Sequence, residues 1–320
     1  MELTGIHHVT AVSGNARANV DFYTQLLGLR LVKKTVNQDV ISTYHLFFAD
    51  GVATPGTDMT FFEWPDVPPH QIGAGDVTTT AFVVPDWPAL EWWVQRFDEL
   101  GVARGEIEEW TGRPTLPFTD PEGQRLELVV GERDGASPWS KSPIPVEMAV
   151  HGFAALHLAV PSIELSSTFL REVLGFRQTR TYESPDGSRR FAVFETGDGG
   201  LGTEVHLEEQ RGRRRAQVGV GGVHHVAFRT PNEEEHRHWR ERLAGAGVGV
   251  TPVIDRYYFK SLYFREPGGV LYEIATDGPG FTADEDIDHL GEKLSLPPFL
   301  EARRPEIEAA LPPLELVAQR

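Results

Sequence analysis

The sequence GIHHV at residues 5–9 recurs as GVHHV at residues 222–226, and this repeat constrains the fold more than any other part of the chain. Self-similar segments adopt the same supersecondary unit, so the two copies predict two equivalent strands, each opening with a pair of histidines. The second copy is followed by EPGGVLYEI at residues 266–274, a turn that leads into a strand carrying an acid among apolar neighbours. Imidazoles at equivalent positions of two strands, with a nearby carboxylate, predict a shared metal site.

Four segments repeat a common pattern along the chain. Each has a strand-like run, then an aromatic-bearing amphipathic run that closes on an apolar residue, a glycine and another apolar residue. A glycine in this position is the usual end of a helix, because it tolerates the left-handed backbone there. The four glycines are spaced by 73, 74 and 72 residues, which indicates one module duplicated twice. They are Gly28, Gly101, Gly175 and Gly247.

A single βαβββ module exposes a curved sheet face that it cannot bury alone, so modules must pair. The sequence therefore predicts an α+β fold in which four βαβββ modules form two domains with cup-shaped mixed sheets. Pairing neighbours along the chain gives an N-terminal domain of modules 1 and 2 and a C-terminal domain of modules 3 and 4. The predicted boundaries are 1–135 for the first domain, 136–150 for a Ser/Pro-rich linker, 151–280 for the second domain and 281–320 for a packed C-terminal extension.

Composition narrows the classes of partner and of chemistry. With 47 acidic against 30 basic residues the formal charge is −17, which disfavours nucleic acid and anionic membranes as partners. The chain has no cysteine, so thiolate nucleophiles and Cys-ligated metals are excluded, and any metal must use N and O ligands. No leader pattern and no apolar stretch of roughly 18 residues is present, so a cytoplasmic protein is expected. A homodimer is a fair expectation on general grounds alone.

Alternation along a strand selects one histidine from each pair. Residues two apart share a face, so His8 and Thr10 point to one side of the first strand and His7 to the other, and His224 is likewise opposed to its neighbour. We expect His8, His225 and Glu273 to be the metal ligands. His7 and His224 should face away from the metal unless the strand start is bulged.

Other acids and one basic run need separate interpretations. Glu127 and Glu204 also lie in strands that end modules, but those modules have no histidine in the corresponding place of their first strands, so structural roles are favoured. Glu63 belongs to the module that provides His8, and its approach to the metal is left open. The run of arginines within 211–215 is best explained as a solvated loop.

The chain resembles the vicinal oxygen chelate superfamily and, within it, the ring-cleaving dioxygenases of hydroquinones. The similarity covers nearly the whole chain, and its most specific parts are the two histidine motifs and the run DRYYFKSLYFREPGG at residues 255–269. By this resemblance the iron ligands fall on the three residues already chosen from the strand pattern. It further implies catalytic or substrate-facing roles for His7, Thr10, His224, Arg256 and Tyr263.

These features predict an Fe(II)-dependent, extradiol-type dioxygenase that opens the ring of a hydroquinone, or a substituted one, with O2 as co-substrate. Three protein ligands leave room at the ion for a phenolate oxygen and O2 side by side. Mn(II) with the same ligands, and catechol as the small aromatic substrate, are close alternatives. A glyoxalase-type isomerase or thiol transferase on the same fold would be favoured if Glu63 were a fourth ligand, and a metal-free module that sequesters a drug is the non-enzymatic alternative.

Overall fold

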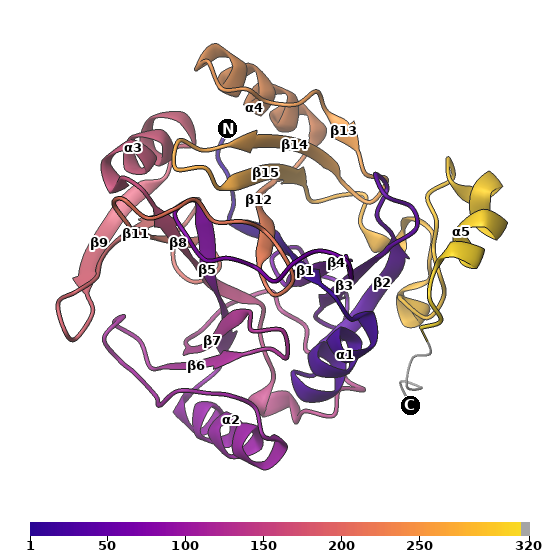
Figure 1. Cartoon of the computed structure of the whole chain (residues 1–320), viewed down its shortest axis with the longest axis horizontal. Helices are drawn as coiled ribbons and strands as arrows, with labels where there is room; N and C mark the ends of the chain where they lie inside the picture. The colour runs from indigo at the N-terminus through magenta and orange to yellow at the C-terminus, as the bar shows by residue number, and fades with distance from the viewer. Residues whose placement is uncertain (315–320) are drawn as a thin grey trace.

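The computed structural model describes residues 1–314, which form four successive modules around two curved mixed sheets (Figure 1). This arrangement confirms the predicted α+β class. Module 1 comprises β1 (Ile6–Ser13), α1 (Ala16–Val20), a π-helical continuation (Asp21–Leu26), β2 (Arg30–Val36), β3 (Tyr44–Ala49) and β4 (Asp58–Glu63). Module 2 comprises β5 (Asp76–Val84), α2 (Trp87–Leu100), β6 (Thr115–Thr119) and β7 (Arg125–Val130).

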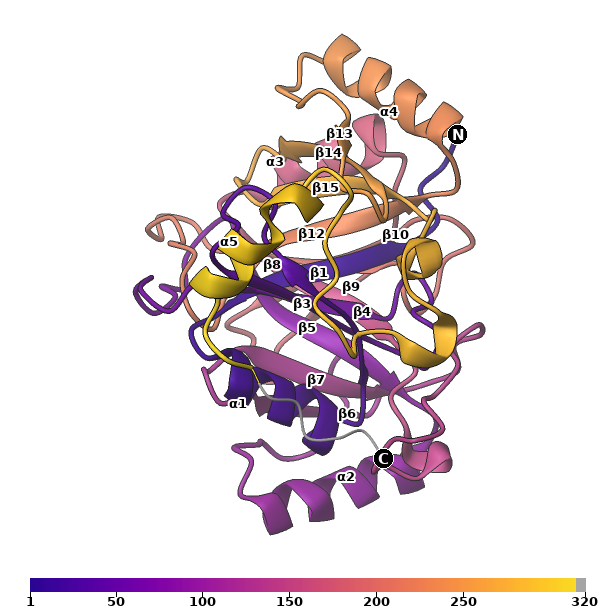
Figure 2. The ribbon, with the colours of Figure 1, turned by 90° about the vertical axis from the view of Figure 1, so that its right-hand side faces the viewer.

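The second half repeats the order of the first. Module 3 comprises β8 (Phe153–Val160), α3 (Ile163–Thr168), a π-helical continuation (Phe169–Val173), β9 (Arg177–Glu183), β10 (Arg190–Glu195) and β11 (Glu204–Glu209). Module 4 comprises β12 (Val223–Thr230), α4 (Glu233–Gly245), β13 (Ile254–Asp255), β14 (Lys260–Arg265) and β15 (Leu271–Thr276). The module helices α1 to α4 lie outside the sheets, as Figures 1 and 2 show from two directions.

The glycines predicted to end the module helices all have left-handed backbones. Their φ angles are 75°, 67°, 78° and 76° for Gly28, Gly101, Gly175 and Gly247. A side chain at such a position would be strained, so glycine is required for the chain to reverse into the next strand. The four-module repeat could be recognised in the sequence because each module needs a glycine with positive φ at the end of its helix.

Modules do not pair in the order predicted from the chain. One sheet has the order β13-β14-β15-β12-β1-β4-β3-β2 and joins modules 4 and 1, whereas the other has the order β6-β7-β5-β8-β11-β10-β9 and joins modules 2 and 3. The pairing of module 1 with 2 and of module 3 with 4 was wrong. The connections 64–75 and 210–222 carry the chain from one sheet to the other, and they run beside each other through the bridges Pro69↔Val220 and Gln71↔Gln217.

Strand pairing explains this exchange of partners. First strands pair antiparallel with first strands, β1 with β12 and β5 with β8, and each of these first strands also pairs parallel with the last strand of its own module. Such pairing depends on side chains distant in sequence, which a local pattern does not reveal. The segment 136–150 consequently links two modules of the same sheet, and it is anchored by buried Trp139 and Ile144. The domain boundaries along the chain stay a prediction.

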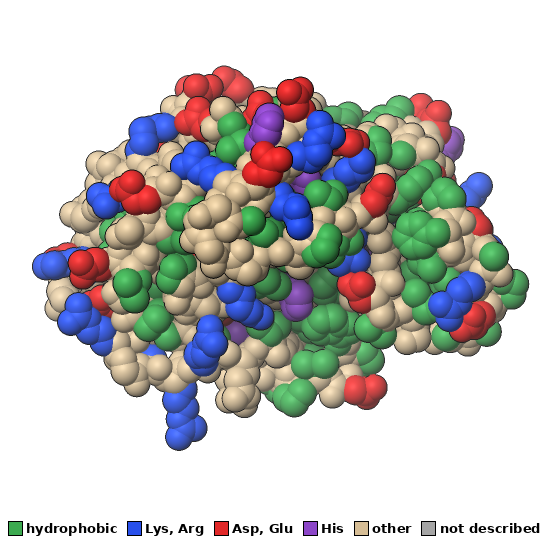
Figure 3. Space-filling view, turned by 90° about the horizontal axis from the view of Figure 1, so that it is seen from above, with side chains coloured by type: hydrophobic (Ala, Val, Ile, Leu, Met, Phe, Trp, Pro, Cys, Tyr) green, Lys and Arg blue, Asp and Glu red, His purple; other side chains and the backbone are tan. Residues whose placement is uncertain are grey.

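Charges of both signs are interspersed over the face shown in Figure 3. None of the helices within residues 1–314 combines the length and the apolar character needed to cross a membrane.

The C-terminal extension lies beside β2 (Figure 1), and it contains short helical turns and α5 (Arg304–Ala310). Its main anchor is Lys33 of β2, whose side chain is fully buried. The Lys33 ammonium donates to Asp284 Oδ1 at 2.7 Å and to the Phe281 carbonyl at 3.1 Å, and it also contacts Glu285. Asp284 in turn accepts from the Tyr258 hydroxyl at 2.8 Å. Residues 315–320 of the predicted extension lie outside the described residues.

Replacing Lys33 by methionine should lower the free energy of unfolding, because two largely buried carboxylates would lose their cation. We expect a loss of about 3 kcal/mol in a urea titration. Lys34→Met is the matched control, since Lys34 makes only a 3.4 Å contact with the Glu292 carbonyl, and its loss should stay below about 1 kcal/mol. Equal losses in the two variants would show that the buried ion cluster does not anchor the extension.

Candidate metal centre

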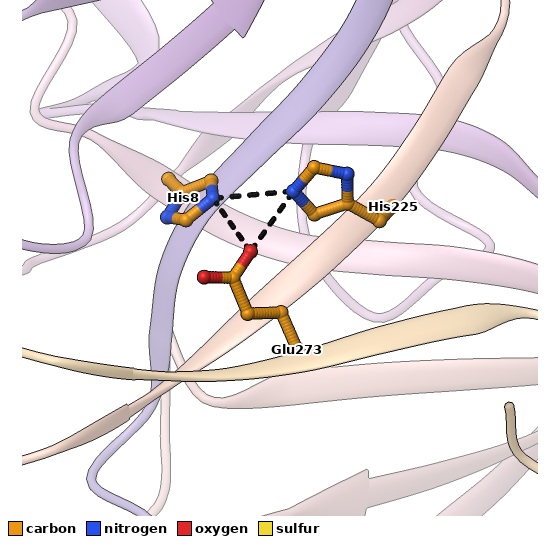
Figure 4. Close-up of side chains that lie close together, drawn as sticks. All are labelled: His8, His225 and Glu273. Atoms are coloured by element: carbon orange, nitrogen blue, oxygen red, sulfur yellow. Dashed lines mark hydrogen bonds and ion pairs between the residues drawn. The ribbon is translucent and has the colours of Figure 1, made fainter. Parts of the chain in front are cut away.

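Three side chains predicted from the sequence meet on one face of the eight-stranded sheet: His8 of β1, His225 of β12 and Glu273 of β15 (Figure 4). His8 Nε2 and His225 Nε2 are 3.4 Å apart, and they lie 3.2 Å and 3.0 Å from Glu273 Oε2. All three are buried. Within residues 1–314, these three side chains are the one group of acids and imidazoles whose atoms lie close enough together to bind a single ion.

Strand register brings these residues together. Ala227 of β12 pairs with His8 of β1 on one side and with Glu273 of β15 on the other. His8, Ala227 and Glu273 therefore form one row across three adjacent strands. His225 is two residues before Ala227 and therefore points to the same face. The small side chain of Ala227 keeps the centre of the row open.

The electrostatics favour a cation between the three side chains. Burial raises the pKa of Glu273, but the adjacent His8 and His225 outweigh it, and the pKa lies well below its usual range. Neither Glu273 oxygen receives a hydrogen bond within the described residues. A buried carboxylate that receives no hydrogen bond is energetically costly unless a cation compensates its charge. The two imidazole nitrogens and the carboxylate oxygen are separated by 3.0–3.4 Å. These separations suit three ligand atoms that each lie about 2.1 Å from one ion, because two such atoms at right angles are about 3 Å apart.

His7 and His224 lie directly behind the candidate ligands. His7 Nδ1 is 2.8 Å from His8 Nδ1, and His224 Nδ1 is 2.8 Å from His225 Nδ1. The β1–β12 register shifts between Ile6 and His8, an irregularity of the kind that would let His7 turn back toward its neighbour. Neither histidine lines the pocket above the site. Their geometry fits a positioning role, since each holds the second nitrogen of a candidate ligand.

The hydrogen-bond network defines the tautomer of His8. His7 Nε2 lies 3.2 Å from the Thr276 carbonyl oxygen, so this nitrogen must carry the proton and donate. Burial and the neighbouring His8 lower the pKa of His7 to about 3, so its ring is neutral and its Nδ1 can only accept. His8 must then donate from Nδ1. In the neutral form of His8, the lone pair of Nε2 then faces Glu273 and His225, as a metal ligand requires.

Glu63 does not approach the three donors. Its Oε1 accepts from the Ala16 backbone N–H at 3.2 Å, at the far end of β4. The position equivalent to Glu273 in module 1 is Thr60, because Thr10 pairs with Thr60 as Ala227 pairs with Glu273. The place of a fourth protein ligand is thus taken by a hydroxyl.

A pocket of about 440 Å³, its open mouth included, lies above His8 and His225. Thr10, Arg256 and Tyr263 line it. Burial and then Glu273 raise the pKa of Tyr263, so its hydroxyl remains a hydrogen-bond donor at neutral pH. The other lining residues are Thr35, Asn37, Gln38, Asp39, His45, Phe47, Phe62, Tyr258 and Phe259.

The most informative lining residue that the sequence did not indicate is His45 of β3. Its Nε2 lies 2.9 Å from Thr60 Oγ1, which is 2.9 Å from Thr10 Oγ1. Burial holds the pKa of His45 well below its usual value. His45 lacks a repeated motif, and the only available signal was its place in the third strand of the module that supplies His8.

Two paired βαβββ modules with a candidate three-ligand site in their cup are the arrangement of the vicinal oxygen chelate class. Residues 5–128 and 152–274 match the model of the Glyoxalase/Bleomycin resistance protein/Dioxygenase superfamily. The chain belongs to this superfamily and, within it, to the ring-cleaving dioxygenases.

The relatives that support this placement align over nearly their whole length. MhqA of Bacillus subtilis, named "Putative ring-cleaving dioxygenase", is 44% identical over 98% of this chain and 100% of its own. Chlorohydroquinone/hydroquinone 1,2-dioxygenase of Sphingobium indicum is 31% identical over 95% of this chain and 94% of its own. A solved dioxygenase structure from Bacillus subtilis, titled "putative", has a TM-score of 0.90, 38% identity and 98% coverage of both chains.

Metal binding should depend on the cluster and not on Glu63. We expect the metal-free protein to bind one equivalent of Co(II), followed by its visible absorption, and His225→Ala to lower the affinity at least 100-fold, since one of three ligands is lost. Glu63→Gln should bind like the original chain because its carboxylate lies elsewhere. Weak binding by Glu63→Gln, in protein with an unchanged melting temperature, would contradict the three-ligand site.

Proposed function

We propose that this protein is an Fe(II)-dependent, extradiol-type dioxygenase that cleaves the ring of a hydroquinone with O2. The observation that carries the proposal is the one-sided site: His8, His225 and Glu273 cluster at the floor of the pocket, and Asp39 and His45 of the pocket lining lie outside this cluster. Such a set suits Fe(II) and leaves room for two exogenous ligands. The relative named as a hydroquinone dioxygenase supports the choice of substrate.

The ion would be held by the three clustered side chains. When bound, Fe(II) lowers the pKa of a coordinated ring hydroxyl and allows electron transfer from the ring to O2. His7 and His224 would keep the two ligand imidazoles in place, and His7 would also favour the metal-binding tautomer of His8. His8, His225 and Glu273 together supply one negative charge, so the loaded site would keep a net positive charge that attracts a phenolate.

The pocket walls would bind and orient the substrate. Phe62 and Phe259 offer apolar surface for a ring and exclude water from above the donors. The Tyr263 hydroxyl is placed to donate a hydrogen bond to an oxygen that becomes negative during ring opening. Arg256 provides a fixed positive charge at the same wall, with its guanidinium 5.5 Å from the Tyr263 ring centre.

A path for a proton leads from the pocket through Thr10 and Thr60 to His45. The two hydroxyls and the imidazole are joined by contacts of 2.9 Å, and hydroxyls can donate and accept at once. Because burial holds the pKa of His45 well below its usual value, its neutral imidazole and the two hydroxyls would pass a proton along this chain rather than store one. The product would be an unsaturated semialdehyde acid, or an acyl chloride or acid from a chlorinated ring.

Thr60 argues against the isomerase and thiol transferase alternatives. A four-ligand site would need a carboxylate or imidazole at this position. The nearby acids of β4 do not supply it, because Glu63 is bonded elsewhere and Asp58 is outside the ligand cluster of the described residues. Cleavage of catechol would use the same metal ligands and is the second candidate reaction. The O2-consumption experiment below distinguishes it from hydroquinone cleavage.

O2 consumption tests the proposed reaction. Protein reconstituted anaerobically with Fe(II) should consume O2 with methylhydroquinone, and faster than with catechol, while His8→Ala should show no substrate-dependent uptake. Mn(II) reconstitution in parallel ranks the two ions. Absence of uptake with either ring, from protein shown to hold its metal, would overturn the dioxygenase proposal.

The pocket should prefer a neutral ring to a carboxylated one. Arg256 Nη2 is 3.0 Å from Asp39 Oδ2, so its charge is already matched at the pocket wall. Asp39→Asn should free this charge and raise kcat/KM for 2,5-dihydroxybenzoate relative to hydroquinone by roughly fivefold, a small effect because Asp39 is 71% exposed. Asp21→Asn, which removes a surface partner of Arg17, is the control and should leave the ratio unchanged. An unchanged ratio in Asp39→Asn would exclude this electrostatic selection.

A further inference from the structure

The seven-stranded sheet repeats the candidate metal centre with different residues. Ala81 pairs with Glu127 as Ala227 pairs with Glu273, so Glu127 takes the place of the carboxylate ligand. Ala81 also pairs with Ala155, in the position of His8. The same register places Thr79 where the first cup has His225, since Thr79 pairs with His157 as His225 pairs with Thr10. The second cup has thus kept the acid and lost both imidazole ligands.

A wide cavity, about 2160 Å³ with its open mouth, lies over this acid. His157 Nε2 approaches Glu127 Oε2 to 3.4 Å, yet that oxygen accepts no hydrogen bond from residues 1–314. Glu127 lines the cavity and its side chain is 15% exposed, although Oε2 itself is buried. A carboxylate that is largely buried and only partly accessible at a cavity floor favours a ligand that brings an O–H or N–H group.

One wall of the cavity is aromatic and continuous with its floor. The ring centres of His157 and Phe191 are 6.2 Å apart, and Phe191 is 5.5 Å from Trp110. The Arg189 guanidinium lies 5.3 Å from the Trp110 ring centre and 5.4 Å from that of Phe191. A flat ring could lie against Trp110 and Phe191, beneath this cation, by the contacts that these side chains already make with each other.

We propose that the second cup is a metal-free binding site for a phenol. The hydroxyl donates to Glu127, and the ring packs against Trp110 and Phe191. A carboxylate ligand is disfavoured at the floor because it would meet the charge of Glu127. The site takes the same chemical class as the proposed substrate but needs no metal and no O2, and it stands whether or not the first cup cleaves hydroquinones.

The test uses 4-fluorophenol and metal-free full-length protein, with binding followed by 19F NMR titration. We expect Glu127→Gln to weaken binding at one site about tenfold, because a charge-assisted hydrogen bond becomes a neutral one. Trp110→Leu should weaken the same site at least threefold through loss of ring contact. Glu209→Gln, at the cavity rim, should bind like the original chain.

A ligand lacking the hydroxyl proton isolates the contact with Glu127. 4-Fluoroanisole should bind the original chain more weakly than 4-fluorophenol, and equally well to the original chain and to Glu127→Gln. Arg256→Ala reports on the first cup and should leave the Glu127-dependent site unchanged. The proposal is overturned if 4-fluorophenol does not bind, if its affinity survives both Glu127→Gln and Trp110→Leu, or if binding is lost only in Arg256→Ala.

Discussion

The antiparallel contact between β1 and β12 is the constraint on which the candidate centre depends. It aligns Val9 with Val226 and so places the two histidine motifs head to head near the local twofold axis of the sheet. Side chains alternate across a sheet, so a slip of one residue would turn His8 toward the helices and bring a different histidine of the pair inward. Register therefore decides which imidazole of each motif meets Glu273 and which one supports it from behind.

Local signals carried much of the fold and the candidate ligands, whereas non-local pairing could not be foreseen. The four helix-ending glycines and the strand period of two are properties of short segments, which is why the modules and the meeting of His8, His225 and Glu273 could be predicted. The exchange of module partners depends on contacts between residues 71 to 83 positions apart in one sheet and more than 200 apart in the other. However, the predicted metal centre combines His8 of module 1 with His225 and Glu273 of module 4. It therefore already favoured a sheet shared by modules 1 and 4 over the pairing of modules that are neighbours along the chain. Asp39 and His45 were missed because only the folded loops and strands bring them to the pocket.

The two cups separate the contribution of the scaffold from that of the side chains. Both place an acid on the strand beside the same small residue, Ala227 in one and Ala81 in the other. In the first cup two imidazoles complete a set of donors around an anionic oxygen without hydrogen-bond donors. In the second, Ala155 and Thr79 leave the acid facing an open, aromatic cavity. Equivalent backbones thus present different chemistry because a few inward-facing residues changed.

Partnership of the first and last modules also affects how the protein is made. β1, which carries His8, is synthesised before β12 and β15, which follow it by more than 200 residues. Until then β1 has no partner on one edge, while modules 2 and 3 can already assemble their own sheet. The candidate ion site is consequently closed by the last module, and a truncated chain would lack both His225 and Glu273. A chain could therefore bind the metal with all three ligands only after module 4 has been synthesised and has paired with module 1.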